Sequence, residues 1–562
     1  MEKHSVGIFP TTDPLGDVGE EVLPCTACSD FDELSKPVQK TMPRHWWATH
    51  FLSALDLPEL ETLRNHPNDF HISLGTDATG ANGPYFCMEG AKVALAQEGV
   101  TLHVALEFGS EDPGPNGDVP RLFNKLNCPP TVMFSDMNKR RRSGPATADR
   151  AEGCGMALTR PCDVYFAGTE CKDLSNANTT SKKELDWEIT DQSGNSTLTL
   201  HSSCDFVETW QPAVVFMEQV YRILVIKLIL AKMRGMGIYD VEIFKTDNLQ
   251  FGLSNTRPRI AGVAVNLRKV RLLRPVHQWQ ACLGKMAAAV PPGRITEFLL
   301  EPDCEDIAQA ALAAELKGQS RSASDEMKVW LNSEAFKLHE SIRRHLRIRF
   351  SVDVPSDAQM RDEWLGSPGW GKWCTLREQD VLNLHWWVTV VILKLNPQDY
   401  VWLWDLKCSA NYPFEKRPSK SNVSGCLTRF RTYFLTSHLR LVLGREQMMM
   451  MVFPRDMRTA ENGIEVIADE ELSGLAGNAI GVPPFGALYL AMFANVDFSC
   501  SHGSPPQPGT HNVYNAAINL KDDARTEADG DDGDVDDDAG YLNKLPCDPP
   551  AKKTQKRKTE SV

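Results

Sequence analysis

The sequence contains no long apolar run that is free of charge. The most hydrophobic stretch, residues 214–233, is interrupted by Glu218, Arg222, Lys227 and Lys232, and charged side chains at mid-span are costly inside a bilayer. The first residues also lack a basic region followed by an apolar run, the pattern of a secretory signal. We therefore expect no membrane partner, and we interpret 214–233 as a buried strand that leads into an amphipathic helix.

The cysteines lack a repeating pattern. There are 15 of them, an odd number scattered over 562 residues, which favours a reducing compartment over a disulfide framework. Cys25 and Cys28 form one CxxC, but no second CxxC completes a tetrahedral zinc site, and His45 is a weak substitute. The sequence therefore predicts an intracellular protein without a metal site.

An excess of positive charge is also missing, since 60 Lys and Arg stand against 74 Asp and Glu. The charge is uneven: residues 521–540 hold ten acids and two bases, whereas 551–562 hold five bases and one acid. A nucleic-acid site would have to be a local basic surface. The run KKTQKRK predicts nuclear import, although such runs also serve only to keep a chain soluble. Nothing in the sequence indicates an oligomeric state.

The arrangement of apolar segments predicts the domain organisation. Residues 1–69 form a leader that is partly helical around Trp46 and Trp47, and 499–562 form a disordered tail, acidic and then basic. From His71 onward, short apolar runs alternate with helical stretches, which is typical of an α/β fold with a parallel sheet. The expected strands are 71–75, 101–108, 131–135, 163–167, 212–217 and 259–265.

This rhythm is lost between residues 268 and 425, which we interpret as a second lobe. It contains an Ala-rich helix at 305–317 and a cationic helix around 342–350. The pair Trp386 and Trp387 has apolar neighbours and is expected in the core of this lobe. The α/β pattern resumes at 426–498, so the main domain is predicted to consist of 70–267 and 426–498.

A glycine-rich turn follows the first predicted strand. The segment HISLGTDATGANGPYF runs from a strand through Gly75, Gly80 and Gly83 into an amphipathic helix. Such a turn lets the backbone approach a nucleotide-like ligand and points amide groups at it. A plain turn between strand and helix would look similar, so the motif alone is weak.

Acidic residues follow the next two predicted strands. Glu107 lies at the end of TLHVALEF, where a carboxylate can accept hydrogen bonds from ribose hydroxyls, and Glu111 is a close competitor. Asp136 ends the third strand, TVMFSD. Because ligands of open α/β sheets collect at the carboxyl ends of the strands, we expect these acids to lie near the glycine-rich turn.

The fourth and fifth predicted strands bring a thiol and a carboxyl group to the same edge. Cys171 follows the strand DVYFAG, and Glu218 ends AVVFME. A thiolate nucleophile next to a carboxyl group that can hold a proton on a heterocycle is a sensible catalytic pair. A buried structural cysteine is the alternative interpretation.

The order of these segments resembles the cytosine-5 DNA methyltransferase family over residues 70–265 and 420–495. GTECKDLS is similar to the family's Pro-Cys-Gln loop, with Cys171 in the nucleophile position, and Glu218-Gln219-Val220 is similar to its Glu-Asn-Val step. The segment with Asn255, Arg257 and Arg259 resembles the family's Gln-x-Arg-x-Arg strand.

Two later segments extend the resemblance. GREQMMMMVFP is similar to the family's glutamate-led helix before a Gly-Phe-Pro turn, and LAGNAIGVPP, with Gly477 and Asn478, is similar to its closing Gly-Asn motif. There are also departures: Glu170 precedes the cysteine, Lys172 follows it, and Gln219 replaces an asparagine. An acidic neighbour such as Glu170 would raise the pKa of the thiol.

The resemblance implies an α/β, Rossmann-like, S-adenosylmethionine-dependent methyltransferase sheet with an inserted target-recognition lobe at 268–425. It implies a flipped cytosine that is attacked at carbon 6 by Cys171, with Glu218 at ring nitrogen 3, and with Arg259 and Arg257 as the site's arginines. S-adenosylmethionine would be held by Gly75, Thr76, Asp77, Gly80, Glu107, Asp136 and Asn478.

The expected partner is DNA, with RNA as an alternative. Cys426-Leu427-Thr428 resembles the Cys-Phe-Thr step of the family's tRNA branch, and a catalytically lapsed nucleic-acid-binding protein is the third hypothesis. Three basic clusters are candidate phosphate contacts, although each could be an ordinary charged face. They are Lys139 to Arg142, Arg268-Lys269-Arg271-Arg274 and Arg343-Arg344-Arg347-Arg349.

Overall fold

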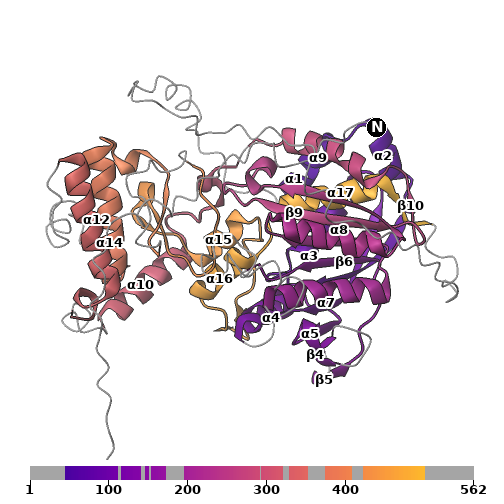
Figure 1. Cartoon of the computed structure of the whole chain (residues 1–562), viewed down its shortest axis with the longest axis horizontal. Coiled ribbons are helices and arrows are strands. Elements are labelled where there is room, and N and C mark those ends of the chain that lie inside the picture. The colour runs from indigo at the N-terminus through magenta and orange to yellow at the C-terminus, as the bar shows by residue number, and fades with distance from the viewer. Residues whose placement is uncertain are drawn as a thin grey trace, which may run out of the picture. The chain divides into compact units, whose positions relative to one another are not determined.

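The computed structural model describes nine segments of the chain (Figure 1). They are residues 45–111, 115–140, 146–150, 153–171, 195–291, 293–319, 328–351, 374–407 and 422–499. The predicted leader before residue 45, the CxxC pair and the charged tail after 499 lie outside them. The chain divides into two compact units, and in the described residues the first contains 45–319, 396–405 and 422–499.

The first unit is built on one mixed sheet in the order β5-β4-β3-β2-β1-β6-β7-β9-β8. The central strands β3, β2, β1, β6 and β7 are parallel, whereas β4, β5 and β9 run antiparallel to their neighbours. The strands are β1 (Asp69–Asp77), β2 (Thr101–Ser110), β3 (Val132–Phe134), β4 (Ala146–Arg150), β5 (Gly153–Ala157), β6 (Val164–Gly168), β7 (Val214–Gln219), β8 (Tyr239–Thr246) and β9 (Arg259–Asn266). This is the α/β, Rossmann-like sheet that the sequence predicts.

Helices cover both faces of this sheet, so its central strands are apolar on both sides. In β7, Val214 and Phe216 face one core, while Val215 and Met217 face the other. The first core lies under α3 (Gly83–Gln97) and α17 (Val482–Asn495), and the second under α7 (Asn195–Trp210) and α8 (Ile223–Gly235). The stretch 214–233 is thus a buried strand followed by a helix, as expected.

The first unit contains further helices. They are α1 (Trp46–Ser53), α2 (Leu57–Arg64), α4 (Pro115–Asn127), α5 (Met137–Arg140), α9 (Trp279–Ala288), α10 (Glu305–Gln319), α15 (Gly444–Met450) and α16 (Asp469–Asn478). Short antiparallel pairs join β10 (Arg271–Leu272) to β16 (Val496–Asp497), β14 (Ala460–Glu461) to β15 (Ile464–Glu465), and β12 (Tyr433–Leu435) to both β11 (Leu403–Asp405) and β13 (Arg440–Leu441).

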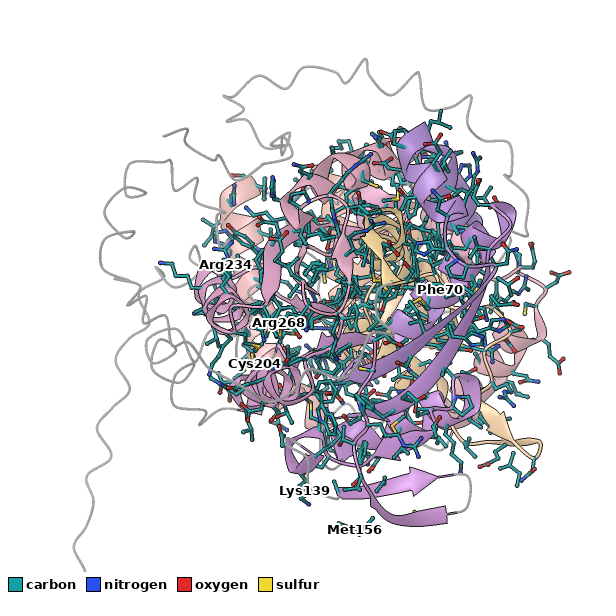
Figure 2. The ribbon with its side chains drawn as sticks, turned by 90° about the vertical axis from the view of Figure 1, so that its right-hand side faces the viewer. Phe70, Lys139, Met156, Cys204, Arg234 and Arg268 are labelled. Atoms are coloured by element: carbon teal, nitrogen blue, oxygen red, sulfur yellow. The ribbon has the colours of Figure 1, made fainter. Side chains whose placement is uncertain are left out.

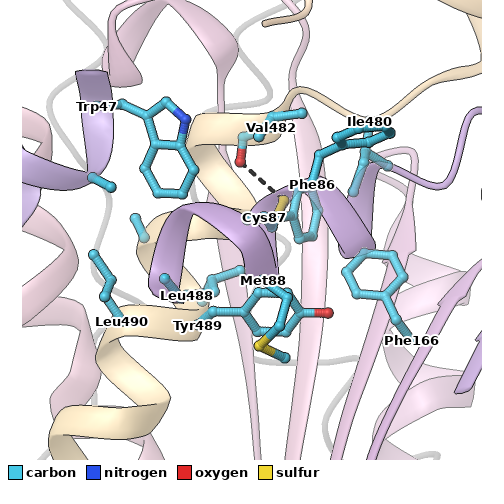
Figure 3. Close-up of a cluster of buried hydrophobic side chains, with 14 of the residues drawn as sticks. Trp47, Phe86, Cys87, Met88, Phe166, Ile480, Val482, Leu488, Tyr489 and Leu490 are labelled. Atoms are coloured by element: carbon cyan, nitrogen blue, oxygen red, sulfur yellow. Dashed lines mark hydrogen bonds between the residues drawn. The ribbon is translucent and has the colours of Figure 1, made fainter. Parts of the chain in front are cut away.

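The helical segment that the sequence assigns to the leader belongs to the main core. Trp47 is fully buried between α3 and α17 (Figure 3), and a methyl group added at either Gly90 or Gly486 would collide with its indole ring. The same view shows the Cys87 thiol donating to the Val482 carbonyl oxygen at 3.1 Å. The core therefore begins before residue 70.

The second unit includes residues 328–351 and 374–395 among those described. Its helices are α12 (Glu334–Phe350) and α14 (Leu376–Trp387), the latter continued by a π-helical turn at Val388–Ile392. Asp380 of α14 is fully buried and pairs with His339 and Arg343 of α12. Trp387 is buried, as predicted.

The predicted lobe 268–425 is not one unit, because residues 268–319 and 396–405 pack with the first. The predicted Ala-rich helix is α10, and the cationic helix is α12. The strand β8 and the β4–β5 hairpin were not predicted. In the described segments, no single helix is long and apolar enough to cross a membrane; α16 and α17 reach that length only together, with a 45° bend.

Candidate active site

The sheet order reverses between β1 and β6. Ligands of open α/β sheets bind at such a point, beyond the carboxyl ends of the strands. Cys171 lies there, three residues beyond the end of β6. Gly168, the last residue of β6, is level with Glu218 of β7 in the parallel register. The structure therefore places the predicted thiol and carboxyl group at the same edge.

Arg259 joins this edge because β9 runs antiparallel to β7. The first residues of β9 lie beside the end of β7, and Ala261 of β9 is level with Glu218 of β7. Arg259 Nε is 2.8 Å from Glu218 Oε1, and the two side chains are only 13% and 9% exposed. A partly buried ion pair of this kind fixes the orientation of the carboxylate.

Arg257 has a different environment from Arg259. Its guanidinium donates to the carbonyl oxygens of Leu427 at 3.1 Å and Gly477 at 3.0 Å, and Nη1 is 3.7 Å from the Cys426 sulfur. Burial lowers the pKa of Arg257. These contacts make it a positioning residue that joins three segments of the site.

Burial raises the pKa of the Cys171 thiol, since it penalises the thiolate. Arg259 and Arg257 oppose this effect, while Glu218 adds to it. The pKa is therefore shifted in the expected direction, with burial as its main cause and Glu218 as a contributing carboxylate. In turn, although burial alone would lower the pKa of Arg259, Glu218 and the nearby thiols raise it.

Gln219 holds the loop that precedes Cys171. Its side-chain amide donates to Thr169 Oγ1 at 2.9 Å, to the Thr169 carbonyl oxygen at 3.1 Å and to the Glu170 carbonyl oxygen at 3.2 Å. Its own oxygen accepts from the Val220 amide at 2.7 Å. In the sequence analysis, Gln219 is only a departure from the family's asparagine. Its place at the end of an apolar strand is the feature that could have indicated a buried amide with backbone partners.

The glycine-rich turn contributes a second part of the site. Gly80 has a left-handed φ of +65°, and its amide donates to Glu111 Oε2 at 3.2 Å. Asn124 donates to the Gly80 carbonyl oxygen and to Glu111 Oε1. A Cβ at Gly80 would lie 3.5 Å from that of Asn478, so the predicted Gly80 and Asn478 are neighbours. Thr79 Oγ1 is buried and has no hydrogen-bond partner among the residues that the structure describes.

The other half of the predicted turn is not a loop. Strand β1 continues to Asp77, so Gly75, Thr76 and Asp77 pair with β2 and β6. A Cβ at Gly75 would strike the ring of Phe108, which explains the glycine by packing. The prediction that the loop starts at Gly75 is wrong, because the apolar pattern does not show how far a polar strand end continues.

Asp77 is the centre of a buried polar cluster. Its carboxylate pairs with Arg140 and accepts hydrogen bonds from Ser110 and Tyr165. The Arg140 guanidinium also lies 4.8 Å from the ring centroids of both Phe108 and Phe206. The side chain of Asp77 is therefore fully used inside the protein, and Arg140 is unable to contact phosphate, contrary to the cluster prediction.

Of the two acidic residues expected near the end of β2, Glu107 lies within the strand and Glu111 follows it. The strand continues past Glu107 to Ser110, and a register shift after Leu74 leaves Glu107 as the extra residue, 3.8 Å from Arg160. Glu111, buried at the strand end, instead faces the Gly80 turn. Glu107 is thus misplaced in the prediction, and its competitor lies where a ribose acceptor is expected.

Asp136 lies two residues after β3, as predicted, and is nearly buried. Its carboxylate accepts from the Asn138 amide at 2.9 Å, and Lys139 is 3.8 Å away. In the described part of the chain, no group of three or more His, Cys, Asp or Glu side chains is arranged to hold a metal ion.

The cluster from Arg268 to Arg274 lies at the opposite edge of the sheet. It follows the end of β9, which is level with the beginning of β7. Arg271 pairs with Asp497, and Arg274 pairs with Glu59. Figure 2 shows Arg268 well separated from Lys139. This cluster is therefore not part of the candidate active site.

No family model and no curated protein matches the sequence. Solved structures with a similar fold include the S. pombe Dnmt2 methyltransferase (11% identity, 75% of this chain and 97% of that chain covered, TM-score 0.38). They also include the Entamoeba histolytica methyltransferase EhMeth (10%, 75% and 98%, TM-score 0.37) and a putative DNA modification methyltransferase from an E. coli prophage (13%, 75% and 98%, TM-score 0.38). These identities and scores describe a similarity of fold alone.

Proposed function

We propose that this chain transfers a methyl group from S-adenosylmethionine to carbon 5 of cytosine in DNA through a covalent adduct with Cys171. The observation that supports this most is the arrangement at the crevice. Cys171 follows β6, the ion pair of Glu218 and Arg259 lies on the neighbouring strands, and the Gly80 turn ends the adjacent strand β1. A nucleophile, a proton-holding group and a cation thus share one edge of the sheet.

Each of these side chains has a distinct task in the proposed reaction. The Cys171 thiolate forms a bond to carbon 6 of a cytosine that has left the base stack, while Glu218 holds the proton at ring nitrogen 3. Arg259 donates to the ring carbonyl oxygen, where negative charge develops. Carbon 5, made nucleophilic by this addition, then takes the methyl group. Its proton passes to a water molecule acting as base, the bond from carbon 6 to sulfur breaks, and the ring and the Cys171 thiolate are restored.

The turn after β1 has features that fit S-adenosylmethionine. Gly80 and Asn478 bring two backbones close together, and the Glu111 carboxylate holds the Gly80 amide. Among the described residues, the buried Thr79 Oγ1 has no hydrogen-bond partner. We propose that Thr79, Gly80, Glu111, Asp136 and Asn478 hold this molecule. When bound, it supplies the methyl group. We leave Gly75 and Asp77 out of this set, because a Cβ at Gly75 would strike the Phe108 ring and the Asp77 carboxylate pairs with Arg140.

RNA is the alternative substrate. The position of Cys426 favours it, because the segment that resembles the tRNA branch lies in the site, 3.7 Å from Arg257. Transfer of tritium from labelled S-adenosylmethionine to DNA and to RNA, each in competition with the other, distinguishes the two. Binding of nucleic acid and S-adenosylmethionine without transfer to either would indicate a lapsed enzyme.

The nucleophile provides the decisive test. We expect Cys171→Ser to abolish transfer and covalent trapping by 5-fluorocytosine oligonucleotides, while binding of S-adenosylmethionine persists. The matched control is Cys154→Ser, because this exposed cysteine lies on the edge strand β5. An undiminished transfer rate in Cys171→Ser would overturn the mechanism.

We also propose that the protein is nuclear, on the basis of the run KKTQKRK. Deleting residues 551–562 from a fluorescently tagged full chain should shift it toward the cytoplasm. Deletion of 521–532 serves as a length-matched control. An unchanged distribution in the first deletion would contradict the proposal.

A further inference from the structure

Two aromatic side chains stand out by their exposure. Tyr221 is 46% exposed and Phe430 is 43% exposed, while every other Trp, Tyr and Phe whose burial the structure describes is buried or half-buried. An aromatic ring left in water forgoes the stabilisation that its burial would bring. Exposed rings of this kind are therefore candidates for binding a partner.

Each of the two rings has a cation above it. Lys245 Nζ is 4.2 Å from the centroid of the Tyr221 ring, and the Arg429 guanidinium is 4.7 Å from that of Phe430. The pairing matters because a flat ring next to a cation offers a nucleotide both a stacking surface and a charge for its phosphate. The charge complementarity favours a nucleic-acid strand as the occupant.

Both pairs adjoin the candidate active site. Tyr221 lies three residues after Glu218, and its partner Lys245 is level with Ile260, the residue next to Arg259. Phe430 lies four residues after Cys426, in a segment whose backbone packs against Gly477. The two rings thus come from different segments of the chain, and each segment adjoins a residue of the candidate site.

The backbone at Phe430 is held in an unusual conformation. Its φ is +55°, a left-handed value that is uncommon for a bulky residue. Its ring lies against Gly474 of α16, where an added Cβ would come 2.6 Å from Phe430 Cε1. One side of the ring therefore packs against α16, while another side is exposed to solvent. A side chain that was only solvent-exposed would not need this fixed orientation.

We propose that Tyr221 and Phe430 are stacking platforms for the bases that flank the target cytosine. These platforms need unpaired bases, so the preferred substrate is a single-stranded or looped strand rather than a fully paired duplex. This inference rests on the proposed function, because it places the target cytosine beside Cys171 and Glu218. It names residues that select the form of the strand, whichever sugar the strand contains.

The test measures binding of fluorescent oligonucleotides to the full chain without S-adenosylmethionine. The oligonucleotides are a cytosine-containing DNA strand, the same strand in a duplex, and its RNA counterpart. We expect Tyr221→Ala and Phe430→Gly each to weaken single-strand binding by about five-fold or more, with less effect on the duplex. Tyr221→Phe keeps a ring and should bind as the wild type does.

Two features of the variants separate this role from a structural one. Glycine accepts a positive φ, so the relieved backbone strain should offset part of the packing lost with the ring. Phe430→Gly should therefore still unfold in one cooperative transition while it binds more weakly. Leu267→Ala is the matched control, since Leu267 is 55% exposed and follows β9 at the opposite edge of the sheet. It should leave binding unchanged.

The outcomes distinguish this proposal from the proposed function. Methyl transfer by the wild type, with unchanged single-strand binding in both ring-removing variants, would overturn the platforms and leave the enzyme. Loss of single-strand binding in those variants, without methyl transfer by the wild type, would support the platforms and overturn the enzyme. Wild-type binding that is equal for single strand and duplex would also overturn the preference for unpaired bases.

Discussion

Arg259 Nε lies 2.8 Å from Glu218 Oε1, and the electrostatic influence of both groups reaches the Cys171 thiol. The antiparallel pairing of β7 and β9 creates this relationship, because it returns the chain to the edge where β6 and β7 end. The same carboxylate that the proposed reaction uses to hold a proton thus makes the nucleophile harder to ionise. Arg259 opposes this effect, because its positive charge lowers the pKa of the Cys171 thiol.

The first prediction concerns the ionisation of Cys171. Because its pKa is raised, the thiolate should form at a higher pH than in an ordinary cysteine, and alkylation by iodoacetamide should increase with pH accordingly. Glu218→Gln removes a carboxylate that raises this pKa, so the alkylation profile should shift to lower pH. Arg259→Gln removes the largest opposing charge and should shift it to higher pH.

Mass spectrometry of the peptide that contains Cys171 gives these profiles residue by residue. The exposed Cys154 supplies an internal reference in the same sample. A wild-type profile at or below that of Cys154, or a shift of Glu218→Gln to higher pH, would contradict the electrostatic account of the site.

The sequence was sufficient for six of the nine strands of the sheet, namely β1, β2, β3, β6, β7 and β9, and for the edge that Cys171 and Glu218 share. Both follow from the hydrophobic pattern and from the order of the segments, since apolar runs mark buried strands and the carboxyl ends of parallel strands lie at one edge of a sheet. It was insufficient for Glu107, because hydrophobic patterning does not show a register shift. It was also insufficient for Arg140, because a basic run looks the same whether its members face water or a buried carboxylate.

The second prediction separates packing from ligand binding at Gly75. Gly75→Ala should destabilise the protein by about 1–3 kcal/mol, because the new methyl group would strike Phe108. Gly155→Ala is the control, since no atom of the described segments lies within 4 Å of a Cβ there, and its effect should stay within about 0.5 kcal/mol. Thermal and urea unfolding measure both. Full stability of Gly75→Ala with lost S-adenosylmethionine binding would restore the original ligand role.

The third prediction concerns the buried pair of Asp77 and Arg140. Asp77→Asn leaves the guanidinium without its counter-charge, which should cost about 3–5 kcal/mol of unfolding free energy. The double variant Asp77→Leu/Arg140→Met removes both charges and should be less destabilised than Asp77→Asn. Urea unfolding of both variants tests this. A double variant at least as unstable as the single one would show that the hydrogen bonds of Ser110 and Tyr165, rather than the charge pair, dominate the cluster.

The fourth prediction divides the basic helix α12 into two functions. Arg343 is 4% exposed and pairs with the buried Asp380, whereas Arg344, Arg347 and Arg349 are exposed. Arg343→Ala should therefore lower the melting temperature of its unit. The triple alanine variant of the exposed arginines should keep that temperature and weaken nucleic-acid binding.

The dependence of affinity on salt decides whether the exposed arginines contact phosphate. Each lost phosphate contact reduces the slope of log affinity against log salt by about 0.9 on duplex DNA and about 0.7 on a single strand, because fewer counterions are released. The triple variant should therefore flatten the slope by up to about two to three units. Titrations at several salt concentrations, with Lys337→Ala as a control on an exposed residue of the same helix, provide the measurement. An unchanged slope in the triple variant would remove α12 from the binding surface. The exposed Lys245 and the half-buried Arg429, which lie beside the two aromatic rings, would then be the next cations to neutralise.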